Sequence, residues 1–272
     1  MLTAFSYAFM QRALIIGLIV GLLCAVLSVF IVLKRWAFIG EGISHAAFGG
    51  VAIGLLLGQS SITFTTIIFC LTTAYLIGLT SRGSRVSADS AIGIFLVASM
   101  ALGVLILALR RNYSVDIFGY LFGNLLATDN HDVTAAAIVA IVVLGFIVIF
   151  FKEISSFTFD PVMAEASGLP VRLLHYGLLT AIALTVVIAV RVVGLILVSA
   201  LLILPAATAR PLARHLLTMM LIAIGITIIC VSFGLWSSYA LNTPSGATIV
   251  LALFVVFLLS LMFGRSVRQH NN

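Results

Sequence analysis

Residues 13–33 read ALIIGLIVGLLCAVLSVFIVL, a run that contains no charged side chain. About 20 consecutive apolar residues are enough for a helix to cross the hydrocarbon core of a bilayer. The run is longer than the apolar part of a secretory signal, and no small-residue cleavage site follows it. It therefore predicts a true membrane span rather than a removed targeting segment.

The same kind of run recurs along the whole chain and predicts a polytopic membrane protein. The runs are apolar on every face and do not alternate, so a β-barrel is not indicated. A helical bundle satisfies the backbone hydrogen bonds in lipid. About nine spans are expected, or eight if one run fails to cross, in a single membrane domain covering residues 1–272. The candidate spans lie near residues 13–33, 37–58, 62–80, 90–109, 133–151, 173–190, 192–209, 216–236 and 247–264.

Composition excludes several other classes of protein. Hydrophobic residues make up 63% of the chain and charged residues only 8%, against about 25% charged in an average soluble domain. Too few charges are present to cover a soluble enzyme, a nucleic-acid-binding domain or a disordered regulator. Cys24, Cys70 and Cys230 lie far apart inside apolar runs and are expected to be buried, without a disulfide or a zinc cluster.

The distribution of Lys and Arg predicts the orientation in the membrane. With the N-terminus outside, ten of the 14 fall on one side, which is expected to be cytoplasmic because cytoplasmic loops carry the excess of these residues. The C-terminus and the polar connection 152–172 are then cytoplasmic as well. The ten are Lys34, Arg35, Arg82, Arg85, Lys152, Arg172, Arg210, Arg214, Arg265 and Arg268.

Two ionisable residues in the second run are the candidate metal ligands. Glu41 and His45 are four residues apart, so on a helix they share a face. Ionisable groups in a membrane helix are costly and usually face a bundle interior or a wet path. A carboxylate and an imidazole form half a site for a divalent cation, and a second copy across a two-fold axis would complete four ligands. A hydrogen-bonded pair of purely structural role is the alternative.

Three further segments carry expectations. In the connection 152–172, Asp160 can cap a short helix that has Pro161 in its first turn and ends at Gly168. In the extracytoplasmic stretch 110–132, the apolar piece 117–127 is too short to span and is expected to be re-entrant or interfacial, and His131 with Asp129 and Asp132 forms a weak patch for attracting metal. Pro205 is expected to kink the run 192–209.

Three co-linear motifs resemble the membrane permease of bacterial zinc/manganese/iron-type ATP-binding-cassette (ABC) importers. They are FIGEGISHAAFGGVAIGL, FTFDPVMAEASGLPV and VVGLILVSALLILPAATAR. The resemblance implies an ABC importer permease fold, type II-like, with about eight to nine transmembrane helices and short re-entrant and coupling helices. The sequence departs from the family pattern at Glu41, where Asp is usual, and at Phe48, Gly49 and Gly50, where many members have Leu-Pro-Gly.

The resemblance also implies partners and roles. A second permease copy, identical or paralogous, a cytoplasmic ABC ATPase dimer and an extracytoplasmic metal-binding protein are expected, in a bacterial plasma (inner) membrane. Glu41 and His45 match the gating ligands for a transported manganese, zinc or iron ion, with no permanently bound cofactor. The ATPase-coupling segment comprises Asp160, Pro161, Ala164, Glu165 and Gly168.

Two other functions remain open from the residues alone. A proton-coupled secondary transporter could also use Glu41 and His45, as a proton relay, although no inverted repeat is evident. A non-transporting membrane scaffold would need neither residue. An enzyme is not expected, and the sequence has no Walker A motif, so ATP hydrolysis would come from a partner subunit.

Overall fold

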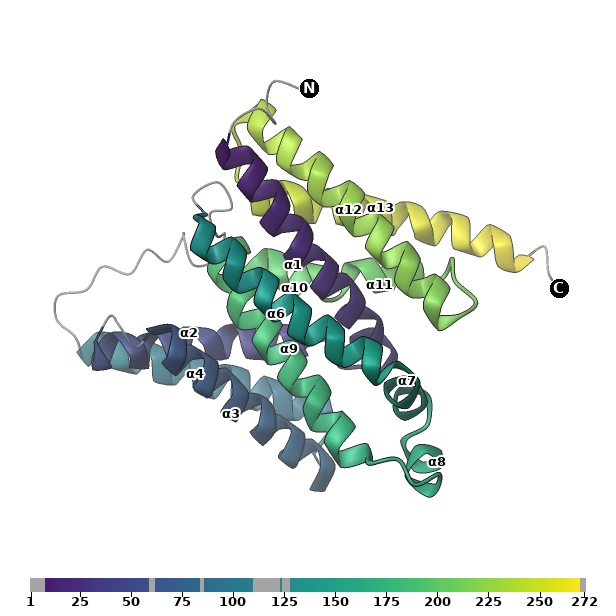
Figure 1. Ribbon diagram of the computed structural model, residues 1–272, viewed down its shortest axis with the longest axis horizontal. Helices are drawn as coiled ribbons and strands as arrows, with labels where there is room; N and C mark the ends of the chain where they lie inside the picture. Colours follow the sequence, from purple (N-terminus) through teal and green to yellow (C-terminus); the bar gives the residue numbers. More distant parts are fainter. Residues whose placement is uncertain (1–7, 59–61, 84–85, 110–122, 124–127, 270–272) are drawn as a thin grey trace.

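The protein is a bundle of helices. The computed structural model describes residues 8–58, 62–83, 86–109, 123 and 128–269, and every regular element in those ranges is helical (Figure 1). Within them, eight helices are long and apolar enough to cross a membrane, which confirms the all-helical membrane fold and the lower of the two span counts. They are α1 (Ala8–Leu33), α2 (Ile39–Leu57), α3 (Ile62–Gly83), α4 (Ala88–Leu109), α6 (Asn130–Ile149), α9 (Val171–Val193), α12 (Leu216–Leu241) and α13 (Ser245–Gln269).

The run 192–209, expected to be a span of its own, is broken into two short helices. Gly194 ends α9 with a φ of +86°, a backbone conformation that suits glycine. The chain then forms α10 (Leu195–Leu201) and α11 (Leu204–Ala209). Pro205 lies in the first turn of α11, where its missing N–H costs no helical hydrogen bond. The predicted kink at Pro205 was therefore wrong, because no continuous helix runs through it.

The broken segment nevertheless carries the chain from one end of the bundle to the other. Arg191, near the end of α9, contacts Asp132 in the first turn of α6. At the far end of the segment, Ala209 packs in one cluster with Val29 of α1 and Met219 of α12, close to the end of α1. The loop between α11 and α12, which contains Arg210 and Arg214, therefore lies at the same end of the bundle as Lys34.

Three helices form the interior. Two thirds or more of the apolar windows of α1, α2 and α9 are buried, against 17% for α4 and 22% for α6. The helices α2, α3 and α4 pack together as one group, and α1, α6, α12 and α13 lie on the other side of α9 (Figure 1). The helix α9 contacts both groups, so it connects them. Cys24, Cys70 and Cys230 are free thiols and buried, as expected.

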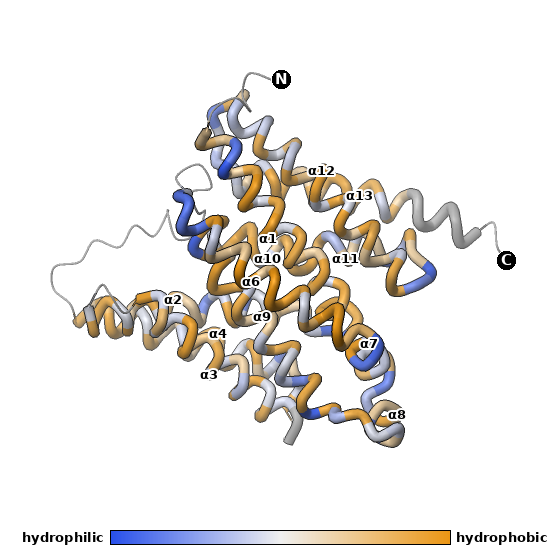
Figure 2. The backbone as a smooth tube through the Cα atoms, in the orientation of Figure 1, coloured by the Kyte–Doolittle hydropathy of each residue, from blue (hydrophilic) through white to orange (hydrophobic). Residues whose placement is uncertain are grey.

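Polar residues gather at the ends of the apolar helices (Figure 2).

At the end that contains Lys34, the connection after α6 forms α7 (Phe151–Phe159) and α8 (Pro161–Ala166). The sequence predicted one short helix here, and α8 is that helix. The additional helix α7 begins after a break at Phe150, whose φ of −101° and ψ of 23° fall outside the helical range.

The close packing of α2 on α3 depends on glycines. A Cβ atom added at Gly50 would lie 2.7 Å from the Cα of Thr66, and one at Gly54 would lie 2.6 Å from the Cα of Ile62. Because the neighbouring atoms belong to backbone, they can give way only if the two helices separate.

We expect Gly50→Ala to lower the thermal unfolding midpoint of the purified permease in detergent, because overpacking of this kind costs about 1–3 kcal/mol. Gly93 of α4 is the matched control, since a Cβ there meets nothing within 4 Å. Gly93→Ala should leave the midpoint unchanged or raise it slightly. Equal midpoints for the two variants would contradict the packing role of Gly50.

Candidate functional site

A tight connection places the beginning of α2. Arg35, with a φ of +59°, terminates α1, and the backbone N–H of Trp36 donates to the carbonyl of Ile31 at 2.9 Å. This is a Schellman-type end, in which a left-handed residue closes the helix. The N–H of Ile39 then donates to the carbonyl of Trp36 at 2.9 Å. The first turn of α2 is therefore fixed relative to the end of α1.

One stripe of α2 remains at the molecular surface. Between Phe38 and Gly50, the only residues of α2 and its N-cap that are not buried are Phe38, Glu41, His45 and Phe48. Their spacing of three, four and three residues puts them on one face of the helix. We call these four residues the α2 stripe. On its flanks, Gly42 packs against Ile92 of α4 and Gly40 against Leu202, just after α10.

Glu41 and His45 form the polar centre of the α2 stripe. The Nε2 atom of His45 lies 2.9 Å from Oε1 of Glu41, and the side chains are 16% and 33% exposed, respectively. Because an ionised carboxylate only accepts hydrogen bonds, Nε2 carries the proton in this pair. In the neutral imidazole the lone pair is then on Nδ1. The pair thus offers a carboxylate oxygen and an imidazole nitrogen to a cation.

A third polar group approaches the pair from a different helix. The hydroxyl of Ser199, on α10, lies near the Glu41 carboxylate and has no hydrogen bond of ordinary geometry with any described residue. Sequence reasoning missed Ser199 because α10 was expected to be part of a continuous span. No cluster of three or more His, Cys, Asp or Glu side chains that could hold a metal occurs among the described residues. A metal held by Glu41 and His45 would therefore need further ligands from outside the described residues.

The predicted coupling residues form one compact corner. Asp160 is the N-cap of α8, and its Oδ1 accepts from the backbone N–H groups of Val162 and Met163 at 3.0 and 2.9 Å. Pro161 occupies the first helical position, and Gly168 follows the helix with a φ of +81°. Ala164 is fully buried and Glu165 is exposed. The cap, the proline and the terminating glycine match the sequence prediction.

The last residue of α7 and the short helix α8 expose apolar side chains. Phe159, Val162 and Met163 are 66%, 79% and 65% exposed, and we call these three residues the α8 surface. Exposed apolar side chains outside the membrane spans are typical of a surface that another protein covers. The fold thus presents an apolar surface at the end of the bundle where the basic loops lie.

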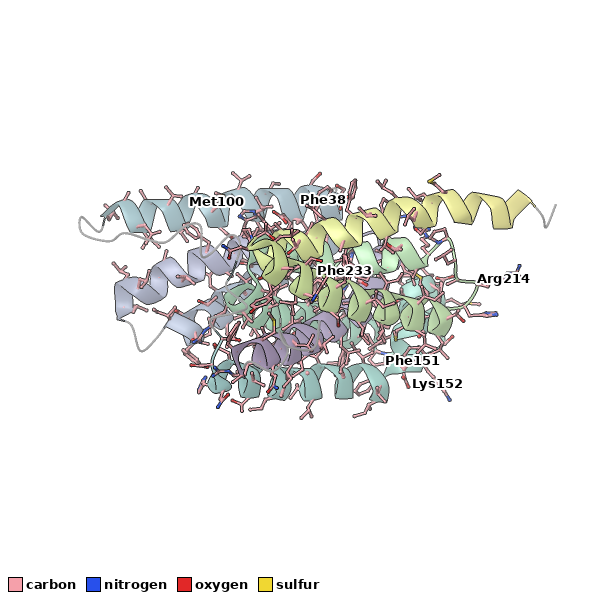
Figure 3. The ribbon with its side chains drawn as sticks, turned by 90° about the horizontal axis from the view of Figure 1, so that it is seen from above. Phe38, Met100, Phe151, Lys152, Arg214 and Phe233 are labelled. Carbon is pink, nitrogen blue, oxygen red and sulfur yellow. The ribbon has the colours of Figure 1, made fainter. Side chains whose placement is uncertain are left out.

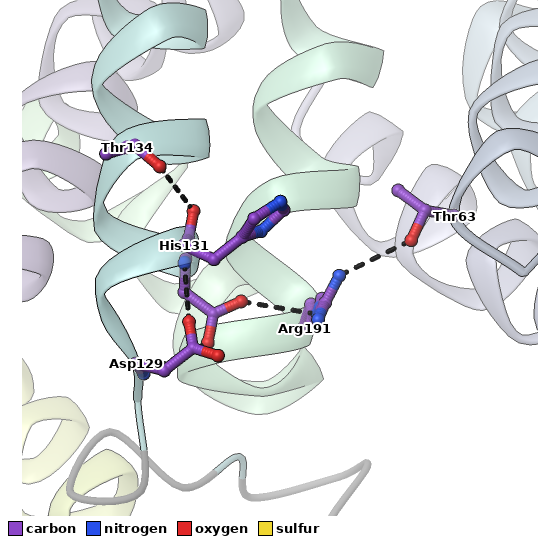
Figure 4. Close-up of polar contacts among 6 residues, drawn as sticks. Thr63, Asp129, His131, Thr134 and Arg191 are labelled. Carbon is purple, nitrogen blue, oxygen red and sulfur yellow. Dashed lines mark hydrogen bonds and ion pairs between the residues drawn. The ribbon is translucent and has the colours of Figure 1, made fainter. Parts of the chain in front are cut away.

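The opposite end of the bundle has a polar cluster that joins three helices (Figure 4). The Nε atom of Arg191 on α9 lies 3.4 Å from Oδ1 of Asp132 on α6, and its Nη1 donates to the hydroxyl of Thr63 on α3 at 3.3 Å. Asp129 and Asp132 also form a reciprocal cap at the start of α6. Both carboxylates are therefore engaged in helix capping, and Asp132 also pairs with Arg191. Of the expected re-entrant piece 117–127, all but Gly123 lies outside the described residues.

The cap at Asp129 has a predictable pH dependence. The backbone N–H of Asp132, which donates to its carboxylate at 2.8 Å, holds the pKa of Asp129 below its ordinary value of 3.8. A carboxylate with a lowered pKa stabilises the folded state above its unfolded pKa, and that stabilisation is lost as the pH falls. We expect the amide of Asp132 to lose protection from hydrogen exchange below about pH 3.8, after correction for intrinsic exchange rates. Asp129→Asn should abolish this dependence, because Asn caps without titrating; a pH dependence that persists in the variant would contradict the assignment.

Comparison with known proteins identifies the family. The model of the ABC 3 transport family matches residues 6–264, which is nearly the whole chain. The chain belongs to the ABC 3 transport family. It is a membrane permease of an ABC transporter and not an enzyme, which confirms the resemblance found in the sequence.

Similar proteins support the assignment over most of their length. The manganese transport system membrane protein MntC of Halalkalibacterium halodurans is 39% identical over 258 residues, covering 95% of this chain and 88% of that protein. A probable iron transport system membrane protein of Haemophilus influenzae is 34% identical over 267 residues, covering 97% of each chain. The solved structure of PsaBC from Streptococcus pneumoniae in complex with Fab has a TM-score of 0.84 and 35% identity, and the match covers 95% of this chain and 93% of that one.

Proposed function

We propose that this ABC 3 family permease imports a divalent metal cation, with Glu41 and His45 as transient ligands at an interface between two copies. The observation that carries the proposal is that Glu41 and His45 form a carboxylate–imidazole pair on the surface of a helix that is otherwise mostly buried. A charged group that faced acyl chains would be costly, so such residues usually face another protein surface or a wet path. A transport path between two copies meets that requirement.

The apolar surroundings of the α2 stripe support a second copy as its cover. Phe38, at the N-cap of α2, and Met100, on α4, lie along the same edge of the molecule in the view of Figure 3. Phe38 is 59% exposed, and α4 exposes apolar side chains along its length. Paired about a two-fold axis, two such faces would bring two carboxylates and two imidazoles together. Four ligands of this kind suit a borderline divalent cation.

The imidazole of His45 favours manganese, iron or zinc over a hard cation such as magnesium, because imidazole nitrogen binds these three metals better than it binds magnesium. The names of the relatives point to manganese first and iron second. The proposed substrate is therefore manganese, with iron and zinc as the alternatives. Brief contact suits transport, because a site that binds an ion too tightly cannot release it.

The proposed orientation follows from the basic residues. Lys34, Lys152, Arg210 and Arg214 lie at the end of the bundle that carries α7 and α8, and the rule for cytoplasmic loops places that end in the cytoplasm. The N-terminus is then extracytoplasmic and the C-terminus cytoplasmic, in a bacterial inner membrane. On this view an ABC ATPase dimer docks on the α8 surface and a metal-binding protein docks at the opposite end, near Arg191.

Reconstitution tests the proposal and separates it from the secondary transporter. The permease, its ATPase and its binding protein are placed in liposomes, and uptake of manganese, iron and zinc is measured with and without ATP. We expect ATP-dependent uptake of manganese and none by the permease alone. Uptake by the permease alone along a proton gradient would overturn the proposal in favour of the proton-coupled alternative.

A further inference from the structure

The connection between α1 and α2 contacts the corner between α7 and α8 through one lysine. The Nζ atom of Lys34 donates to the backbone carbonyl of Phe157 at 3.1 Å. The same atom lies 3.5 Å from the centroid of the Phe157 ring and 5.6 Å from that of Trp36. We call this set of contacts the Lys34 bridge.

The contact of Lys34 with Phe157 is favourable because it lies at the C-terminal end of α7. Phe157 is in the last turn of α7, where backbone carbonyls have no helical N–H partner and the helix dipole is negative. A lysine ammonium there completes a hydrogen bond and offsets the dipole. Stacking over aromatic rings adds cation–π attraction in this partly buried setting. The Lys34 bridge therefore holds the end of α7 directly, and through it Asp160, which caps α8.

Each residue of the Lys34 bridge lies close in sequence to a residue with a role in the proposed mechanism. Lys34 precedes Glu41 by seven residues, and the tight turn at Arg35 and Trp36 fixes the start of α2. Phe157 precedes Asp160 by three residues. A displacement of α8 would thus reach the metal-contacting part of α2 through a short connection.

A cavity beside the bridge leaves space for such movement. It is open to the surface, has a volume of about 370 Å³ and is lined by the α1–α2 connection, the α7–α8 corner and residues of α3, α4 and α9, with Lys34, Trp36 and Phe157 among its lining residues. His175 of α9 closes the cluster, with its ring 5.2 Å from Trp36 and 6.1 Å from Phe157, each in an edge-on arrangement. The pocket leaves room beside the corner for the small displacement that the inference below requires, and the Lys34 bridge would keep the corner joined to α2 during it.

We infer that Lys34 is a positioning residue that transmits the displacement of α8 to Glu41 and His45. This inference rests on the proposed function, because it names the residue that links ATPase docking to the metal path. It requires that loss of the Lys34 ammonium separates ATP hydrolysis from transport without preventing either assembly or metal contact.

The test compares Lys34→Met with Lys152→Met in the reconstituted importer. Both variants remove one positive charge from the same end, and Lys152 is an exposed residue of α7 whose side chain points away from the bundle (Figure 3). We expect Lys34→Met to keep metal-stimulated ATP hydrolysis but to transport about fivefold less metal per ATP, the range of energetic coupling carried by single residues. Lys34→Arg should restore transport, and Lys152→Met should match the unmodified protein. Unchanged transport per ATP in Lys34→Met would overturn the inference.

Hydrogen exchange on the purified permease gives a readout that does not depend on transport. We expect Lys34→Met to increase exchange both in residues 34–41 and in residues 157–163, and Lys152→Met to change neither. An increase confined to one segment, or none, would overturn the inference even if the unmodified importer moved no metal. Failure of the unmodified importer to take up metal would instead count against the proposed function.

Discussion

Glu41→Gln is expected to reduce metal uptake about 100-fold or more while the permease still assembles with its ATPase. The substitution keeps the size of the side chain and removes one carboxylate from each copy, and so both negative charges of the proposed site. Loss of a residue that merely supports a metal ligand costs about 10–100-fold, so loss of a ligand should cost at least as much. Initial rates of manganese uptake in proteoliposomes measure the effect.

Neighbouring substitutions give the controls for this prediction. His45→Gln should cause a similar loss, because it removes the only nitrogen ligand of the pair. Glu41→Asp should retain most of the uptake, since it keeps the carboxylate and its charge. Asp89→Asn removes an exposed acid from the first turn of α4 and should leave uptake unchanged. Equal uptake by Glu41→Gln and Asp89→Asn would show that the Glu41 carboxylate is not a metal ligand.

Val162→Asp combined with Met163→Asp should prevent stable association with the ATPase. Both side chains are largely exposed on the α8 surface, and burial of one apolar side chain of this size contributes about 2 kcal/mol, or about 30-fold in affinity. A carboxylate buried in its place would weaken the contact further. Co-purification of permease and ATPase, followed by measurement of their dissociation constant, tests the expectation.

Leu212→Asp is the matched control for the α8 surface. Leu212 is 42% exposed in the loop between α11 and α12, at the same end of the bundle. The change adds one negative charge outside α8, against two in the double variant, and should leave ATPase binding nearly unchanged. Equal loss of binding in both variants would show that charge at this end, rather than the α8 surface, controls docking.

The sequence predicted the features that depend on local chemistry. Uninterrupted apolar runs predicted the membrane helices, because a bilayer imposes one length and one composition on them. Asp160, Pro161 and Gly168 predicted the start and end of α8, since capping and positive φ are properties of single residues. The spacing of Glu41 and His45 predicted their shared face for the same reason.

Features that depend on packing between distant segments were not predictable in the same way. The run 192–209 is apolar enough to span, yet Gly194 ends one helix there and the chain restarts twice before Arg210. Hydropathy does not register such breaks, because glycine and proline also occur inside membrane helices. Ser199 beside Glu41 and the contact of Lys34 with Phe157, which is 123 residues away, arise only from the tertiary fold.

Cross-linking between copies tests whether the α2 stripe lies at an interface of two permeases. The natural cysteines are buried and should react little, so a cysteine at Phe38 can be treated with a short bifunctional thiol reagent in native membranes. Ile141→Cys on α6 is the control, because that side chain is 73% exposed and belongs to a helix outside the proposed interface. We expect a cross-linked dimer from Phe38→Cys and none from Ile141→Cys. A dimer from Ile141→Cys with only monomer from Phe38→Cys would contradict this expectation.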